Sequence, residues 1–495
     1  MYNIFRELQY VIIKTRARYI IEMKKFIYIL MICVACAACI EDGYTTSPSD
    51  QPTFSTDTLD IGTVFTDEPT PTKRFLVHNP HSKQLSISDI SLSGDAADCF
   101  RLNVDGITGR RFSNVDIRGK DSIFVLVEAT LPQGATPLTE FEASIDFTTN
   151  GRTQSVILAA KGQNVHRIKG DIITENTTFD DFLPYQVFDS LVVAPGATLT
   201  LTPGTTLCFH DKASLIIRGT LVSEGNVEKP VTLAGDRTGN VVTDISFDIM
   251  SRQWTGVFFT ATSTGNRLSH TNIRNTWQGV TIEGDPTAGS DTPQLTIHNS
   301  KLRNSGGLVL EAYHSNIVAT GSEFAEAADG LVYLQGGRYT FNHCTFANYY
   351  LFSALGGPAI QFAHVSDDSD TGLDDLSGYP FTAAEFTNSI IYGNGTELSH
   401  GDLSGTDIYF RRCLLKSAGE DDDNFIECLW DSDPLYYTVR EEYIFDYRLK
   451  PESPAIGAAD PLLTLPEAAT DIYGLHRTDP AEIGAYVFTP PTEEE

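Results

Sequence analysis

Apolar and polar residues alternate in short runs along most of the chain, without the 3.6-residue period of an amphipathic helix. Between residues 53 and 165, runs such as Phe75–Val77 and Ile145–Phe147 are separated by turn residues. Asn150-Gly151 stands between two alternating runs, which is a strong signal for a type I′ β-hairpin. About seven short strands in this region predict an antiparallel β-sandwich.

A repeat of about 22 residues follows the predicted sandwich. Small residues align at the six positions Thr271, Ser300, Ser322, Cys344, Ser389 and Cys413. The gaps between them are 29, 22, 22, 45 and 24 residues. We interpret the 29-residue gap as one repeat with a turn-rich insert, and the 45-residue gap as close to two repeats.

The residues around each aligned position predict how the repeats stack. Apolar residues stand two residues after and three residues before it, and the residue directly before it is His270, Asn299, Gly321, His343, Asn388 or Arg412. Asn, Gly and His tolerate the left-handed backbone of a sharp bend, and Arg412 is the exception. Stacked coils would bury the small residues in an inward ladder beside apolar ladders. Cys344 and Cys413 would then lie about three coils, roughly 14 Å, apart, too far for a disulfide.

Two resemblances follow from these motifs. The strings LDIGTVF, FLVHNP and FTTNGRTQSVILAAKGQ resemble the immunoglobulin-like modules of the abnormal-spindle/hydin type, which implies a spacer or an adhesion unit at residues 53–165. Residues 166–432 resemble a right-handed parallel β-helix of the pectate-lyase-like architecture. The strings DPLYY and YRLKPESPAIGAAD in residues 433–495 are similar to the closing segment of bacterial β-helix proteins, which implies a cap over the last coil. The predicted fold class is therefore all-β.

The N-terminal segment, residues 1–39, reads as a presequence whose true start is Met23. Lys24-Lys25, a short apolar run and small residues precede Cys39. The string CAAC resembles a bacterial lipobox, which implies cleavage before Cys39 and lipidation of its thiol; Cys36 is the alternative, and a plain secretory signal remains open. Glu41-Asp42 resembles the surface-export tag of Bacteroidetes lipoproteins. These features predict an outer-membrane lipoprotein, exposed at the cell surface, with a flexible linker over residues 40–52.

Composition narrows the possible partners. Hydrophobic residues make up 41% of the chain and charged residues 20%, enough to bury a core. The formal net charge is −30, which argues against nucleic acid or an anionic lipid surface as a partner. Beyond the presequence the five cysteines are widely spaced, so neither a disulfide framework nor a cysteine zinc site is expected.

Candidate chemistry is sparse. Asp367, Asp368 and Asp370 form an acidic group that could bind Ca²⁺, the single cofactor suggested, but a solvated acidic loop is the favoured interpretation. Further candidate ligand contacts are His364, His400, Arg411 and Tyr379. Several aromatic residues are candidates for stacking on sugar rings or for ordinary packing: Trp254, Trp277, Tyr349, Tyr350 and Tyr379.

No complete catalytic set is visible in the sequence. Ser399-His400-Gly401 only partly matches the motifs of β-helix glycosidases, and their Asn-Thr-Asp string is absent. The sequence therefore favours a cell-surface lipoprotein with a structural or binding role toward a polysaccharide or a surface protein. The alternatives are a polysaccharide lyase or glycosidase acting on a β-helix face, and a self-associating surface component.

Overall fold

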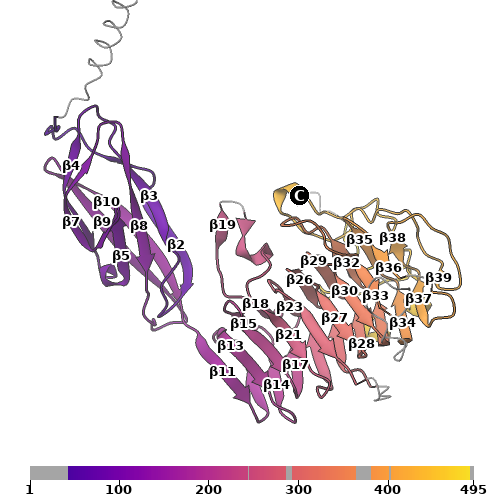
Figure 1. The fold of residues 1–495 in the computed structure, drawn as a ribbon. Coiled ribbons are helices and arrows are strands. Elements are labelled where there is room, and N and C mark those ends of the chain that lie inside the picture. Colours follow the sequence, from indigo (N-terminus) through magenta and orange to yellow (C-terminus); the bar gives the residue numbers. More distant parts are fainter. Residues whose placement is uncertain (1–42, 243–244, 286–291, 364–380, 401–402, 491–495) are drawn as a thin grey trace, which may run out of the picture. The chain divides into compact units, whose positions relative to one another are not determined.

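The computed structural model describes residues 43–242, 245–285, 292–363, 381–400 and 403–490. The chain forms two compact units, residues 1–163 and 164–495. Both are built from β-strands (Figure 1), and the all-β class with a parallel β-helix is confirmed. In the described part of the chain, no helix is long and apolar enough to span a membrane.

The first unit is a sandwich of two five-stranded sheets. One sheet contains, in spatial order, β1 (Thr53–Phe54), β3 (Lys73–His78), β8 (Ser122–Ala129), β5 (Phe100–Val104) and β6 (Ile107–Gly109). The other contains β2 (Thr58–Phe65), β10 (Arg152–Gln163), β9 (Leu138–Thr149), β4 (Leu85–Ser93) and β7 (Arg111–Ile117). A 3₁₀ helix, η1 (Ala97–Cys99), precedes β5. Inward-facing residues such as Val125, Ile145 and Phe147 are fully buried between the sheets.

The predicted hairpin joins β9 and β10. Thr149 pairs with Arg152, and Asn150 and Gly151 have φ values of 49° and 79°. Two consecutive left-handed residues define the type I′ turn, so this prediction is confirmed.

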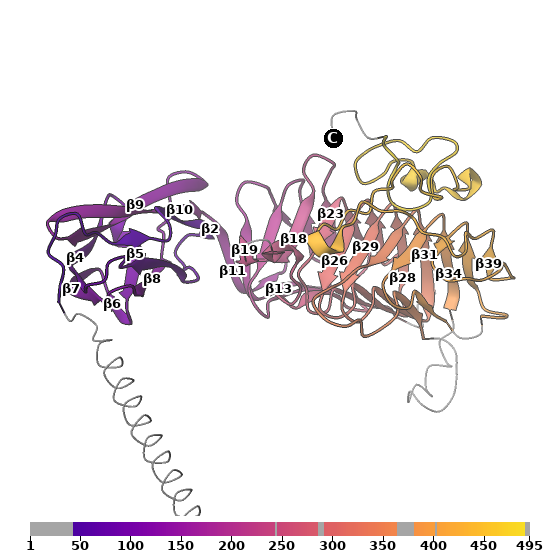
Figure 2. The ribbon, with the colours of Figure 1, turned by 90° about the horizontal axis from the view of Figure 1, so that it is seen from above.

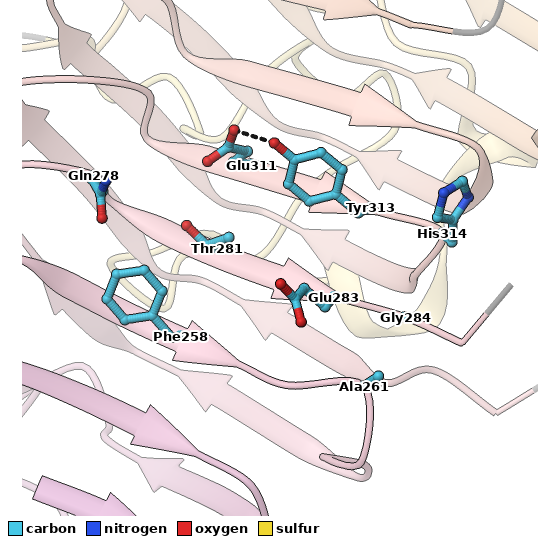
Figure 3. Close-up of a pocket in the computed structure, with 9 residues that line it drawn as sticks. All are labelled: Phe258, Ala261, Gln278, Thr281, Glu283, Gly284, Glu311, Tyr313 and His314. Carbon is cyan, nitrogen blue, oxygen red and sulfur yellow. Dashed lines mark hydrogen bonds between the residues drawn. The ribbon is translucent and has the colours of Figure 1, made fainter. Parts of the chain in front are cut away.

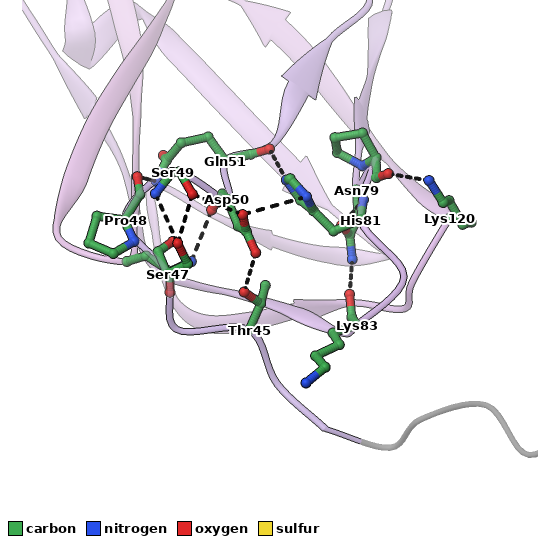
Figure 4. Close-up of polar contacts among 12 residues, drawn as sticks. Thr45, Ser47, Pro48, Ser49, Asp50, Gln51, Asn79, His81, Lys83 and Lys120 are labelled. Atoms are coloured by element: carbon green, nitrogen blue, oxygen red, sulfur yellow. Dashed lines mark hydrogen bonds and ion pairs between the residues drawn. The ribbon is translucent and has the colours of Figure 1, made fainter.

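Residues 43–52, expected to be a flexible linker, instead pack against the sandwich (Figure 4). The Asp50 carboxylate accepts hydrogen bonds from Thr45 Oγ1 at 2.5 Å and Ser49 Oγ at 3.2 Å, and lies 3.8 Å from Nδ1 of His81. The hydrogen bond from Thr45 is the main reason that the pKa of Asp50 is lowered. Asn150 donates to the Asp50 carbonyl at 2.9 Å, so the hairpin turn holds this segment in place. The rest of the predicted linker, and the presequence with Cys36 and Cys39, lie outside the described residues.

The second unit is a solenoid with three faces, and most coils contribute a strand to each face in turn. Face A is a ten-stranded parallel sheet: β12 (Thr177–Phe179), β14 (Thr198–Leu201), β17 (Thr220–Glu224), β22 (Asn266–Ser269), β25 (Leu295–His298), β28 (Asn316–Thr320), β31 (Gly337–Asn342), β34 (Phe381–Thr387), β37 (Ile408–Arg411) and β39 (Phe425–Ile426).

Faces B and C share the long first strands β11 (His166–Ile173) and β13 (Tyr185–Val193). Face B continues through β15 (Thr206–Phe209), β18 (Val231–Gly235), β23 (Thr271–Ile273), β26 (Lys301–Ser305), β29 (Glu323–Ala327), β32 (Thr345–Asn348), β35 (Ile390–Gly393) and β38 (Leu414–Leu415). Face C continues through β16 (Ser214–Ile217), β21 (Gly256–Phe259), β24 (Val280–Glu283), β27 (Leu310–Tyr313), β30 (Val332–Gln335), β33 (Ile360–Phe362) and β36 (Leu398–Ser399). An excursion between β18 and β21 carries β19 (Asn240–Val242), β20 (Ile245–Ser246) and η2 (Phe247–Ile249).

The bend between faces A and B lies where the repeat predicted it. All six residues before the aligned column have φ between 42° and 56°, Arg412 included. All six small residues of the column are fully buried. Their hydroxyls link successive coils, because Ser300 Oγ accepts from the amide of Thr271 at 3.0 Å and Ser322 Oγ accepts from that of Ser300 at 3.1 Å. The apolar columns are also buried, and Phe341 and Phe386 stack with ring centroids 4.8 Å apart.

The interpretation of the 45-residue gap as two repeats is wrong. Strand β32 pairs directly with β35, and Thr345 is the register partner of Ile390. The gap is therefore one coil that carries a long insert. Cys344 and Cys413 are separated by two coil steps rather than three, and both are free thiols.

The C-terminal segment lies along face B (Figure 2), whereas the sequence suggested the open end of the last coil. It contains three 3₁₀ helices, η4 (Arg440–Glu442), η5 (Pro461–Leu463) and η6 (Pro466–Ala468). Apolar residues such as Tyr436, Leu449 and Ile483 cover outward-facing Ala347 and Ile390. These contacts bury most of the outer surface of β29, β32 and β35.

Asparagines at the coil bends also hold the C-terminal segment. Asn299, Asn342 and Asn388 donate to the carbonyls of Asp471, Leu463 and Asp460 at 3.0, 2.8 and 2.9 Å. Each bond satisfies a backbone group in a segment whose described residues, 433–490, form isolated β-bridges but no strand.

Candidate functional site

Face C carries a groove of about 540 Å³ on its outer surface (Figure 3). Its lining comes from β21, β24, β27 and the turns beside them: Phe258, Ala261, Gln278, Thr281, Glu283, Gly284, Glu311, Tyr313 and His314. The figure shows these side chains standing on the same side of three neighbouring strands.

Strand alternation places these residues outward. Val257, Val280, Leu310 and Val332 are register partners on successive coils and are fully buried. The next position on each strand must therefore face solvent. This position forms an outward row of Phe258, Thr281, Glu311 and Tyr333. A second row, two residues further on, contains Glu283, Tyr313 and Gln335.

The corner after β24 depends on a close backbone approach. A Cβ atom on Gly284 would lie 2.0 Å from the carbonyl oxygen of His314, which no side chain tolerates. The amide of Gly284 donates to the carbonyl of Tyr313 at 2.6 Å. Glycine at this position therefore lets the turns after β24 and β27 lie in close contact, and it keeps Glu283, Tyr313 and His314 on the same wall of the groove.

Polar contacts order the side chains of the groove. The Tyr313 hydroxyl donates to Oε1 of Glu311, as the dashed line in Figure 3 marks. Burial, with this carboxylate as a second cause, raises the pKa of Tyr313, so the hydroxyl remains a donor at neutral pH. The Tyr333 hydroxyl donates to Gln335 Oε1 at 3.2 Å, and the rings of Tyr313 and Tyr333 lie 5.7 Å apart.

His314 closes one end of the groove. Its Nε2 lies 3.4 Å from Nε2 of Gln335, and burial lowers its pKa below 6.5. At neutral pH the imidazole is therefore uncharged. The charges on the lining are then those of Glu283 and Glu311.

The candidate residues from the sequence are not brought into this groove. His400 follows β36, and its ring centroid lies 5.6 Å from that of Phe425. Arg411 is on β37 of face A, where its guanidinium lies 4.8 Å from the ring centroid of Tyr409. His364, Tyr379 and the candidate calcium ligands Asp367, Asp368 and Asp370 lie outside the described residues. Within the parts that are described, no three His, Cys, Asp or Glu residues form a group that could hold a metal ion.

The aromatic candidates divide clearly. Trp254 is fully buried and Tyr350 nearly so, which is the packing role that the sequence left open. Trp277 is 47% exposed, next in sequence to the groove residue Gln278, and the Arg252 guanidinium lies 5.1 Å from its ring. Among the four aromatic candidates that the structure describes, Trp277 is the most exposed and stays available for stacking.

Sequence reasoning missed the groove residues Glu283, Glu311 and Tyr313. A signal for them existed, because Thr281, Glu311 and Tyr333 lie 10 or 11 residues after the aligned Thr271, Ser300 and Ser322. Extending the repeat alignment by half a coil would have placed Glu311 in one outward row with Thr281 and Tyr333, and Glu283 and Tyr313 in a second row two residues further on.

Comparison with known proteins adds little to this geometry. No protein-family model matches the chain, and no curated protein matches it either. Among solved structures, a family 123 glycoside hydrolase from Clostridium perfringens aligns at 9% identity and a TM-score of 0.18, covering 25% of this chain and 30% of that one. The chain thus spans under a third of that hydrolase. The PapD-like domain 7 of human CEP192 aligns at 13% identity and a TM-score of 0.17, covering 24% of this chain and 89% of that domain. Likenesses this slight carry no functional argument.

Proposed function

We propose that this protein is a surface lipoprotein that binds glycans through the groove on face C. The observation that carries the proposal is the combination of outward aromatic rings with hydrogen-bonding groups in one groove. Aromatic faces stack on the apolar face of a sugar ring, and carboxylates, amides and hydroxyls bind its hydroxyl groups. Tyr313 and Phe258 supply the rings, and Gln278, Thr281 and Glu283 supply the polar groups.

A glycan array with the full chain in detergent tests this function. Tyr313→Ala removes a ring from the groove. The loss of one aromatic contact should cost about 1.4 kcal/mol of binding free energy, which corresponds to a loss of about tenfold in affinity. Tyr409→Ala, which removes an outward tyrosine from face A, is the matched control and should bind as the unchanged protein does. Binding that survives Tyr313→Ala, or no binding to any glycan, contradicts the proposal.

Membrane attachment through Cys39 is the second part of the proposal. The lipobox-like string supports it, with Cys36 as the alternative site. Metabolic labelling with a fatty-acid analogue should mark the unchanged protein and the Cys36→Ala variant, but not Cys39→Ala. Cell fractionation should place the labelled protein in the outer membrane. If the label is lost only in Cys36→Ala, the lipid is attached to Cys36. If the unchanged protein takes up no label, the protein is secreted without a lipid anchor.

A second candidate function is hydrolysis of the bound glycan. The specific observation is the presence of two carboxylates, Glu283 and Glu311, on neighbouring coils of the same groove. Glycosidases use a pair of carboxylates on either side of the bond they cleave. Release of reducing ends from a glycan found on the array, abolished in both Glu283→Gln and Glu311→Gln, would favour the enzyme over the binding protein.

A further inference from the structure

The groove on face C is lined by negative charges only. The nine lining residues include two carboxylates, Glu283 and Glu311, and neither lysine nor arginine. His314 adds no positive charge at neutral pH, because burial lowers its pKa. The whole chain also has a net charge of −30, so the field around the groove is negative as well.

Both carboxylates can act as acceptors toward a bound molecule. Glu311 receives the Tyr313 hydroxyl on Oε1, while Glu283 is exposed at the end of β24. The Thr281–Glu311 and Glu283–Tyr313 register makes the two glutamates diagonal neighbours on parallel strands, so that strand spacing and rise place their Cα atoms about 8 Å apart. One cationic group can therefore lie close to both.

We infer that the groove binds an oligosaccharide containing an unacetylated, positively charged amino sugar. This inference rests on the proposed glycan binding and adds the charge of the ligand. An ammonium group offers three donors to acceptor-only carboxylates, and its positive charge is attracted to both of them. An acidic sugar would bring its carboxylate next to two others without a cation to compensate.

The lining favours a sugar over a lysine-rich peptide. The half-buried faces of Phe258 and Tyr313 flank the amide of Gln278 and the hydroxyl of Thr281. Flat rings beside neutral donors and acceptors suit a pyranose, which has an apolar face and a rim of hydroxyls. An extended peptide would instead pair with an open sheet edge, whereas β24 and β27 are paired on both sides within the sheet.

Titration calorimetry with three defined oligosaccharides tests the inference at pH 7. The probes are glucosamine oligomers, the same oligomers fully N-acetylated, and galacturonic acid oligomers. The full chain in detergent should bind the free amine at least tenfold more tightly than the acetylated oligomer, and the uronate weakest. Raising the salt concentration from about 50 to 500 mM should remove most of the preference, because exposed charges are screened.

Two variants connect the preference to the groove. Glu283→Gln combined with Glu311→Gln should bring the affinities for free-amine and acetylated oligomers within about twofold of each other. Glu385→Gln removes a half-buried outward glutamate from face A and should leave the tenfold preference intact. Unchanged circular dichroism and thermal midpoints show that the variants remain folded.

The outcomes separate the two proposals. If no oligosaccharide binds, the proposed glycan function fails. If the acetylated or uronate oligomer binds as tightly as the free amine, glycan binding stands and the inference about charge is overturned. A lysine peptide of equal length that displaces the glucosamine oligomer at equal concentration also overturns it, because the groove would then recognise charge without the sugar.

Discussion

Glu326 links the C-terminal segment to the solenoid and should make the stability of this unit depend on pH. Its side chain is 1% exposed on β29, where it accepts hydrogen bonds from the Tyr447 hydroxyl and from the amide of Tyr349 at 3.1 Å. Burial raises the pKa of Glu326 to about 7 from its ordinary 4.5, although these hydrogen bonds and Arg303 oppose the shift.

The sign of the effect follows from the direction of this shift. The folded protein holds a proton on Glu326 more tightly than the unfolded chain, so its free energy of unfolding falls as pH rises from 4.5 to 7. One pKa unit corresponds to about 1.4 kcal/mol, so the loss across this range is about 3 kcal/mol. Glu326→Gln keeps the shape and an acceptor for Tyr447 but cannot ionise. We expect it to be at least as stable as the unchanged protein at pH 8.

Thermal unfolding followed by near-ultraviolet circular dichroism measures this difference, since Tyr349, Tyr436 and Tyr447 pack together under the C-terminal segment. The midpoint should fall between pH 5 and 8 more steeply for the unchanged protein than for Glu326→Gln. The histidines are common to both proteins, so their contribution to the pH dependence cancels in the comparison. Glu452→Gln, an exposed change in the same segment, is the control.

Parallel curves for the unchanged protein and Glu326→Gln would refute the reasoning, because the glutamate would then be solvated or ionised in the folded protein. Glu323→Gln provides the opposite case. Glu323 is fully buried and pairs with Arg303, which is 23% exposed. Without this carboxylate the partly buried Arg303 guanidinium loses its charged partner, which should lower the free energy of unfolding by about 1.5–3 kcal/mol.

Two further predictions concern the bends of the solenoid. Ser300→Ala removes the acceptor for the buried amide of Thr271. It should lower the free energy of unfolding, measured by urea denaturation, by about 1–3 kcal/mol. An unchanged value would mean that the inward ladder adds nothing to stability. Gly321→Ala adds a Cβ atom to a residue with φ 56°, and this atom would lie 2.2 Å from Oδ1 of Asn299. The free energy of unfolding should therefore fall by more than the roughly 1–2 kcal/mol typical of a left-handed residue. A smaller loss in the same assay would show that this bend relaxes freely.

The repeating part of the fold could be predicted from the sequence because each coil repeats the same physical requirement. A sharp bend needs a left-handed residue, and a small side chain must follow it inside the coil. The sequence pattern therefore identified all six bends, including Arg412, whose residue type is the least suited to a φ of 52°. The requirement comes from the neighbouring coils, and they override the preference of a single residue.

The number of coils could not be predicted in the same way. A gap of 45 residues has the length of two repeats, but Thr345 pairs directly with Ile390. Length alone does not distinguish a degenerate coil from an insert in one coil. Tyr349 and Tyr350, which pack where this insert begins, were open candidates for sugar stacking because the sequence did not show which surface would cover them.

Residues on faces B and C illustrate why the alternation of one strand is insufficient to assign exposure. Glu323 and Glu326 belong to the same strand, and Glu323 alternates with the inward-facing Phe324, a pattern that predicts solvent contact. Both are buried because a segment more than 100 residues later covers face B, and Tyr447 and Tyr486 donate to them. Glu283 and Glu311 lie on strands of the same type, but they remain in an open groove on face C. The two pairs of glutamates therefore differ through the path of the C-terminal segment, which buries Glu323 and the pH-sensitive Glu326 and leaves Glu283 and Glu311 available to a ligand.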